Sequence, residues 1–209
     1  VAGLAGDRVP VELTSLSREF DIGGVVLAPG HVSDPLRVAE LAREIQALGR
    51  EVPPWVALHP DAPSRVPAAD AWPPLAALGH ADDPALTTAY ATALARERLA
   101  LGLTLEFGPV LDLESSRASG AVRAHTIARD ATLAARHTRA IVETARALGL
   151  ATCGRHFPGT GEAEPDAGGA CPLVELPPDR LEAVEWVPFR AAFEAGLPAV
   201  MVGHVIVPA

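Results

Sequence analysis

The sequence Arg155-His156-Phe157-Pro158-Gly159-Thr160-Gly161, followed after four residues by Asp166-Ala167-Gly168, bears most strongly on the fold. It begins where the apolar run Leu150–Cys153 ends, and that run has the composition of a buried strand. The proline fixes one backbone angle, and the two glycines beside it allow backbone conformations that other residues avoid. Charged and polar side chains are therefore expected to gather in a defined loop just beyond a strand.

Short β-rich apolar runs alternate along the chain with stretches rich in alanine, leucine and arginine. This alternation is typical of βα units around a parallel sheet. Strands are expected near Gly24–Ala28, Trp55–Leu58, Leu103–Phe107, Leu150–Cys153 and Ala199–Val205, with Val1–Leu4 as the tail of another. Helices are expected at Pro35–Leu48, Pro84–Leu101, His125–Leu148 and Pro178–Ala195. Glycines stand where helix C-terminal caps belong, at positions Gly102, Gly149 and Gly196.

The number of expected strands bears on the fold class. A complete (β/α)8 TIM barrel has eight strands and about 250 residues. The sequence predicts an α/β fold of this type, incomplete, with about five or six βα units. We expect one domain over residues 1–209 that lacks the C-terminal strands. Because Ala199–Val207 would leave an exposed apolar edge, we expect the protein to continue there or to self-associate.

Residues 60–84 interrupt the alternation with closely spaced prolines. Proline at this density prevents a regular helix throughout the segment. We expect a long loop here, on the face of the barrel where active sites lie.

Composition narrows the classes of partner. Of the 209 residues, 49% are hydrophobic and 21% charged, which is typical of a globular protein, and the formal net charge is −9. This charge, without any basic cluster, argues against nucleic acid or a membrane surface as partner. The sequence shows neither a bilayer-spanning apolar run nor a leader, so we expect a cytoplasmic protein. Cys153 and Cys171 are expected to be ordinary reduced thiols rather than a bridge.

The loop resembles the signature K-H-F-P-G-H-G-x4-D-S-H of glycoside hydrolase family 3, in particular its β-N-acetylglucosaminidase branch. Phe107–Leu113 (FGPVLDL) is similar to a second motif of the family. Leu181–Arg190, continuing to Val205, is similar to its L-x6-P-F-R…A-G…A-V-M…H-V pattern. The resemblance covers most of the chain after residue 100. It implies a TIM barrel, retaining hydrolysis of a β-linked amino sugar, a small carbohydrate ligand, and neither a cofactor nor a metal.

The resemblance also implies roles for single residues. In the family, a loop His hydrogen-bonded to an Asp serves as acid/base; here Asp166 holds the Asp position and Gly168 the His position. Glycine has no proton to transfer, so Glu162 or Glu164 is the possible substitute acid. The family nucleophile would lie beyond Ala209.

Substrate binding is expected from residues near the strand ends. Arg155 and His156 stand where the family has a Lys-His pair that binds sugar hydroxyls; the alternative is an ordinary arginine and a structural histidine. Asp112 fits the family's P-V-L-D, with a capping role as the alternative. The remaining candidates are His204 and Arg123, the second being the only residue retained from a G-E-R-S segment. The family's V-D-Q-E-G-G-R-V has become Ala57–Val66 (ALHPDAPSRV), which lacks its Asp and glycines.

Three functions compete at this point. The first is a retaining glycoside hydrolase acting on β-linked N-acetylhexosamine or cell-wall glycans. The second is a catalytically impaired family member that binds a glycan or a protein, suggested by Gly168, Thr160 and the changed 57–66 segment. The third, a metal-dependent hydrolase using His59, His156, His204 and Asp112, has no fixed-spacing motif to support it. We expect the family barrel with weak or absent N-acetylglucosaminidase activity.

Overall fold

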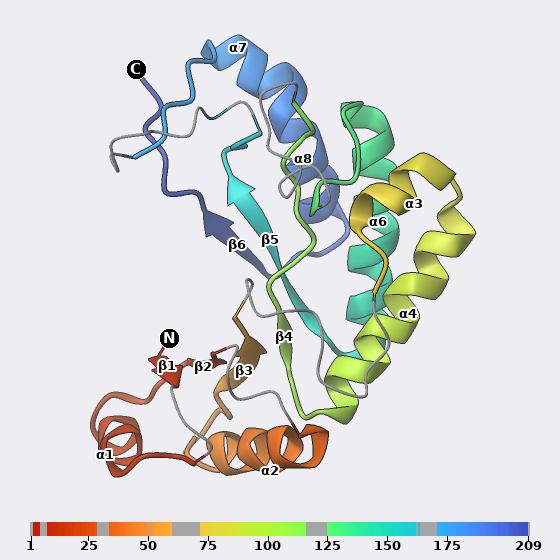
Figure 1. Ribbon diagram of the computed structural model, residues 1–209. Helices are drawn as coiled ribbons and strands as arrows, with labels where there is room; N and C mark the ends of the chain where they lie inside the picture. The colour runs from red at the N-terminus through yellow and green to blue at the C-terminus, as the bar shows by residue number, and fades with distance from the viewer. Residues whose placement is uncertain are drawn as a thin grey trace. The chain divides into compact units, whose positions relative to one another are not determined.

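The computed structural model describes residues 2–4, 8–28, 34–49, 51–59, 72–115, 125–161, 163 and 171–208 (Figure 1). The chain forms two compact units. The N-terminal unit comprises Val1–Trp72 with Ala93–Phe107, and the C-terminal unit comprises Pro73–Thr92 with Gly108–Ala209. Each unit contains parallel strands joined by helices, so the fold is α/β.

The N-terminal unit contains a parallel sheet in the order β1-β2-β3. Its strands are β1 (Ala2–Leu4), β2 (Gly24–Leu27) and β3 (Trp55–Leu58), connected by α1 (Val11–Phe20) and α2 (Pro35–Gln46). Val25 on the central strand pairs with Ala2 on one side and Val56 on the other. Thr104, just before β4 (Leu105–Glu106), donates its N–H to the carbonyl of Val56 at 2.9 Å.

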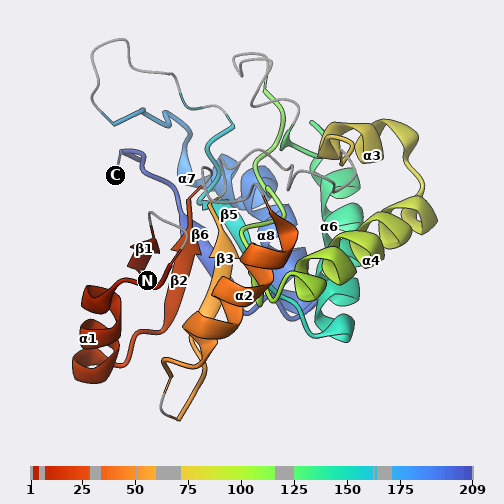
Figure 2. The same ribbon diagram turned by 60° about the horizontal axis from the view of Figure 1, so that its bottom comes forward.

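Helix α2 packs one face against this sheet, as Figure 2 shows. The helix begins where Asp34 accepts a hydrogen bond from the backbone N–H of Leu36 at 3.0 Å, and Pro35 follows the cap as the first helical residue. Apolar residues at helical spacing then form the core with the strands: Val38, Leu41 and Ile45 from α2, and Val25, Leu27 and Val56 from the sheet. Burial of this apolar stripe stabilises the unit.

The C-terminal unit is built around β5 (Ala151–Phe157) and β6 (Ala199–Val202), which run parallel. Its helices are α3 (Leu75–Ala81), the first part of α4 (Pro84–Ala100), α6 (Ala131–Leu148), α7 (Pro178–Arg180) and α8 (Trp186–Glu194). A π-helical turn, Leu181–Glu185, joins α7 to α8. On the other side of β5, Val110 bridges to Arg155 in parallel. Helices α6 and α8 lie side by side next to the strands (Figure 1).

The residues of helix α6 explain where the helix begins and ends and which side of it is buried. Asp130 begins it by accepting a hydrogen bond from the N–H of Leu133 at 2.7 Å. Gly149 ends it with φ of 88°, a left-handed conformation that favours glycine. Between these caps, the side chains that face inward include Ala134, Ile141 and Val142. The helix therefore presents one apolar stripe to the core of the C-terminal unit.

The segment that follows β6 pairs with the segment Pro172–Val174. Ile206 donates its N–H to the carbonyl of Pro172 at 2.8 Å and accepts the N–H of Val174 at 2.9 Å. Leu173 and Ile206 thus form an isolated parallel bridge. Val202 and Ile206 remain 70% and 51% exposed, so apolar surface is present at this edge, while self-association there stays a prediction.

Most of the expected elements are confirmed, with shifted ends. Strand β5 extends four residues further than expected, through Phe157, whereas β4 is limited to Leu105–Glu106. Helix α6 begins at Ala131 rather than at His125, because Asp130 caps it. The glycine caps are confirmed: Gly102, Gly149 and Gly196 all have positive φ.

Two helices were not expected from the sequence. α1 has only Leu13 and Ser17 buried, so its apolar pattern is weak. The interpretation of residues 60–84 as a loop was wrong for Leu75–Ala81, which form α3. This helix begins directly after Pro73 and Pro74. The prolines precede this helix and therefore do not interrupt it. No helix in the described part of the chain is long and apolar enough to cross a membrane.

Candidate active site

Three candidate residues lie at the carboxyl ends of adjacent parallel segments in the C-terminal unit. Asp112 follows the Val110–Arg155 bridge by two residues, His156 lies near the end of β5, and His204 follows β6. Leu111 donates its N–H to the carbonyl of Arg155 at 2.6 Å, which sets Asp112 beside His156. His204 is exposed. The sequence placed these residues at strand ends, and that placement is observed.

Asp112 is buried, with 4% of its surface exposed. Its Oδ1 accepts the backbone N–H of Thr160 at 2.7 Å. Its Oδ2 lies 2.8 Å from Nδ1 of His156 and accepts the backbone N–H of His156 at 3.3 Å. Both carboxylate oxygens are thus used within the protein. These contacts are of the kind expected for the capping role, and the substrate-binding role of Asp112 stays a prediction.

His156 differs from Asp112 in its exposure. Its side chain is 35% exposed, and Nδ1 is held by Asp112. Within the described ranges, Nε2 has no hydrogen-bonding partner. The Asp112 carboxylate therefore fixes the orientation of the His156 imidazole through Nδ1. Nε2 lies on the opposite side of the ring from this contact.

Arg155 is held firmly by its backbone and is 9% exposed. Its N–H donates to the carbonyl of Pro109 at 3.2 Å, and it is paired with Met201 of β6 on the other side. Its role in sugar binding stays a prediction.

The loop after β5 is fixed by close backbone approaches. A Cβ at Gly161 would lie 2.0 Å from the carbonyl oxygen of Leu113, and one at Gly203 would lie 2.7 Å from Cγ2 of Thr160. Gly203 also donates its N–H to the carbonyl of Phe157 at 2.7 Å. Two of the glycines therefore serve close packing as well as turning.

Glu185 is a buried acid beneath this loop that sequence reasoning missed. It is 2% exposed, lies at the end of the π-helical turn, and pairs with Arg180 at 3.2 Å. A Cβ at Gly159, which has φ of 113°, would lie 3.0 Å from the Cβ of Glu185. The sequence signal that could have identified Glu185 was its position on the buried side of the Leu181–Arg190 segment. Its place in a π-helical turn is a structural signal, because such turns recur at functional sites.

Several candidates lie outside the described residues: Asp166, Gly168, Glu162, Glu164 and Arg123. Their assignments stay predictions. In the described part of the chain, no group of three or more His, Cys, Asp and Glu residues is arranged to hold a metal ion. His59, His156, His204 and Asp112, where the sequence left a metal site open, do not form such a group.

The two thiols are both free. Burial raises the pKa of Cys153, so this thiol is held in its protonated, weakly nucleophilic form. A structural role for Cys153 follows.

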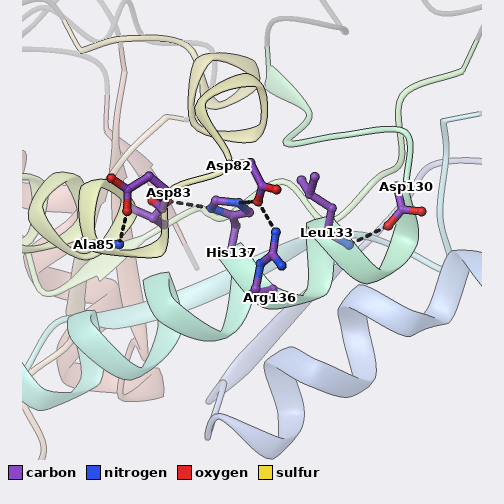
Figure 3. Close-up of polar contacts among 8 residues, drawn as sticks. Asp82, Asp83, Ala85, Asp130, Leu133, Arg136 and His137 are labelled. Atoms are coloured by element: carbon purple, nitrogen blue, oxygen red, sulfur yellow. Dashed lines mark hydrogen bonds and ion pairs between the residues drawn. The ribbon is translucent and has the colours of Figure 1, made fainter.

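A second cluster of polar residues joins the α3–α4 corner to α6. Figure 3 shows Arg136 and His137 projecting from α6 toward Asp82. His137 is fully buried, with Nε2 3.3 Å from Asp82 Oδ1 and Nδ1 2.7 Å from the Thr87 hydroxyl. Because both ring nitrogens are occupied inside the protein, this His–Asp pair is structural.

Asp82→Asn is expected to lower thermal stability at neutral pH. The hydrogen bond from Arg136, and then that from His137, lower the pKa of Asp82 in the folded protein. The resulting stabilisation is present above the pKa of the unfolded chain and is lost as pH falls through the folded-state pKa. Melting curves of both proteins between about pH 7 and pH 3 should therefore converge toward the acid end. A difference that stays constant over this range would contradict the assignment.

The comparisons with known proteins agree with this geometry. The sequence matches the family described as glycosyl hydrolase family 3 N terminal domain over residues 9–209. A beta-hexosaminidase of Xanthomonas euvesicatoria pv. vesicatoria is 32% identical over 216 residues, covering 99% of this chain and 64% of the relative. This chain thus spans slightly less than two thirds of that protein's length.

Solved structures give the same result. NagZ from Neisseria gonorrhoeae, in complex with N-trifluoroacetyl-D-glucosamine, superposes with a TM-score of 0.89 at 28% identity, over 99% of this chain and 63% of that one. A family 3 beta-N-acetylglucosaminidase from Paenibacillus sp. str. FPU-7 has a TM-score of 0.88 at 30% identity, over 100% of this chain and 41% of that one. With the family match extending over nearly the whole sequence, the chain belongs to glycosyl hydrolase family 3 and corresponds to its N-terminal domain.

Proposed function

We propose that this protein is a retaining glycoside hydrolase of the β-N-acetylhexosaminidase type, acting on an amino-sugar or cell-wall glycan with weak activity. The observation that carries the proposal is the placement of Asp112 and His156 together at adjacent strand ends, beside Arg155. The similar proteins support it, since they include beta-hexosaminidases and a NagZ that binds a glucosamine derivative.

The proposed architecture is a single (β/α)8 barrel domain of which this chain supplies about five or six βα units. The coverage of the relatives, at 64% of the Xanthomonas protein, supports this reading. We also propose, from the sequence alone, a cytoplasmic location and self-association through the C-terminal edge.

Each residue has a proposed part in the chemistry. A retaining glycosidase requires a nucleophile and an acid/base on opposite sides of the bond that breaks. We assign hydroxyl binding to Arg155, His156, His204 and Arg123, and the orientation of an acid/base to Asp166. Gly168 supplies no proton, so a glutamate on the same loop, Glu162 or Glu164, is the proposed acid.

A second candidate function is an impaired family member that binds glycan or a protein without turnover. Gly168 and Thr160, which stand where the family has two histidines, favour this alternative. The same loop carries both departures, and the Ala57–Val66 segment carries a third.

The proposed function is tested by hydrolysis of an aryl β-N-acetylglucosaminide, using the protein as its gene encodes it. We expect slow but measurable release of the aryl alcohol, with retention of configuration at the anomeric carbon. No release together with binding of N-acetylglucosamine would favour the second candidate. Neither release nor binding would contradict the hydrolase and the glycan-binding form of the second candidate.

Replacing the proposed acid should change the pH dependence of that hydrolysis. A general acid must be protonated, so its titration produces the alkaline limb of kcat/KM. We expect Glu162→Ala or Glu164→Ala to remove this limb and to reduce the rate about 10²- to 10⁴-fold. Glu175→Ala, at an exposed glutamate, is the matched control. If neither loop variant alters the profile, the acid lies elsewhere.

A further inference from the structure

The contacts of Asp112 determine where the hydrogen of the His156 ring lies. Oδ1 receives the backbone N–H of Thr160 at 2.7 Å, and Oδ2 receives the backbone N–H of His156 at 3.3 Å. A backbone N–H only donates, so both carboxylate oxygens act as acceptors, and an ionised carboxylate has no hydrogen of its own to donate. The third contact, from Nδ1 of His156 to Oδ2 at 2.8 Å, is consequently an N–H donating to the carboxylate.

This arrangement leaves the other ring nitrogen with a defined role. In a neutral imidazole one nitrogen carries the hydrogen and the other accepts. We propose that Asp112 is a positioning residue that holds His156 as the Nδ1–H tautomer, so that Nε2 accepts a hydrogen bond from a hydroxyl of a bound sugar. The proposal rests on the proposed function for the nature of the ligand. It adds which atom of His156 contacts a sugar hydroxyl and in which direction the hydrogen bond runs.

Two histidine–carboxylate pairs among the described residues of the C-terminal unit separate this role from a structural one. In the His137–Asp82 pair the ring is fully buried and each nitrogen has a partner inside the protein. In the His156–Asp112 pair the carboxylate is buried and the ring is 35% exposed. Of these two pairs, the second leaves one ring nitrogen without a hydrogen-bonding partner in the described part of the chain.

The neighbouring side chains of Arg155 and His156 differ in the hydrogen-bonding groups that they present to a ligand. The Arg155 guanidinium can only donate hydrogen bonds. A sugar hydroxyl both donates and accepts. It can therefore donate to Nε2 of His156 while it accepts a hydrogen bond from a donor such as Arg155. The Nδ1–H tautomer therefore selects for hydroxyl groups, whereas a protonated ring would offer a second donor and favour an anionic ligand.

The tautomer is measured directly by NMR on the protein as its gene encodes it. The ¹⁵N shifts of the two ring nitrogens separate a nitrogen that carries hydrogen from one that does not. We expect the His156 ring to show protonated Nδ1 and unprotonated Nε2 at about pH 8.5, well above the ordinary pKa of imidazole. His156→Gln assigns the signal by its disappearance. A ring found with hydrogen on Nε2 overturns the proposal without any need for a folded variant of Asp112.

Asp112→Asn tests the cause of the tautomer. An amide offers one acceptor and one donor where the carboxylate has two acceptors. The closer backbone N–H, from Thr160 at 2.7 Å, requires the amide oxygen, because a backbone N–H cannot change its role. The amide N–H₂ then faces Nδ1 of His156, and the ring responds by moving its hydrogen to Nε2.

The expected result is a switched tautomer with binding of N-acetylglucosamine weakened about three- to tenfold, the change that corresponds to one lost hydrogen bond. Asp82→Asn, which alters the carboxylate partner of the buried His137, is the matched control; it should leave both the His156 shifts and the affinity unchanged. An Asp112→Asn protein that binds the sugar as tightly as the native one overturns the proposal.

The two proposals fail in different ways. If the unmodified protein hydrolyses the glycoside but shows hydrogen on Nε2, the positioning role alone is wrong. If it shows the Nδ1–H tautomer but neither binds nor hydrolyses the sugar, the proposed function is wrong, and the ligand-reading role of His156 falls with it.

Discussion

In a protein without the two proposed glutamate acids (Glu162→Ala with Glu164→Ala), Gly168→His is expected to raise the hydrolysis of an aryl β-N-acetylglucosaminide by about 10²- to 10⁴-fold, the usual contribution of general acid/base catalysis. The substitution returns an imidazole to the position where the resemblance to the family implies the acid/base, two residues after Asp166. Imidazole titrates near neutral pH, and a neighbouring carboxylate stabilises its charged form. The measurement is kcat/KM as a function of pH for both proteins.

The neighbouring glycine offers a matched control for this gain. Gly169→His adds the same side chain one residue further along, where the pattern D-x-H is not restored. Asp166→Asn in the Gly168→His background should remove most of the gain, because the new imidazole loses its partner. Equal activity of the two histidine variants, or a gain that survives Asp166→Asn, would contradict the assignment of this loop.

Gly161→Ala is expected to have the second large effect, on stability and on activity together. The added Cβ would lie 2.0 Å from the carbonyl oxygen of Leu113, and backbone atoms on both sides must shift to admit it. Overpacking of this kind costs about 1–3 kcal/mol. For a chain of this size, that predicts a decrease in Tm of about 2–4 °C per kcal/mol. Thermal melting and the rate of hydrolysis should both fall.

Gly23→Ala is the matched control for this substitution. A Cβ at Gly23 would meet nothing within 4 Å, and its backbone is not in the left-handed region. We expect this variant to melt within about 1 °C of the native protein or slightly above it, because alanine restricts the unfolded chain. Equal decreases in Tm for the two alanine variants would show that the Leu113 contact is not the cause.

The buried strands were predictable because their signal is local. Gly24–Leu27 and Trp55–Leu58 are short apolar runs between turn residues, and both were expected almost to the residue. α1 was missed because most of it faces outward: Val11 and Phe20 are 77% and 66% exposed, so no apolar stripe marks it. α3 was missed because the prolines before it dominated the interpretation of its segment.

The candidate site was only partly predictable, for a different reason. The strand ends that carry Asp112 and His156 follow from the alternation of strands and helices. That Asp112 is buried and fastens both His156 and Thr160 depends on contacts between residues 44 and 48 positions apart, which no local pattern encodes. The same holds for His137, whose burial on α6 depends on Thr87 and Asp82.

The pairing of Ile206 with Pro172–Val174 has a consequence for how this site changes over evolutionary time. Before residue 162, the backbone N–H of Thr160 is held by Asp112, and after residue 170, Pro172 and Val174 are held by Ile206. These hydrogen bonds use only groups that lie outside residues 162–170. A substitution inside that range, such as one at position 168, therefore removes none of these groups, so the sequence there can diverge while the flanking contacts are inherited.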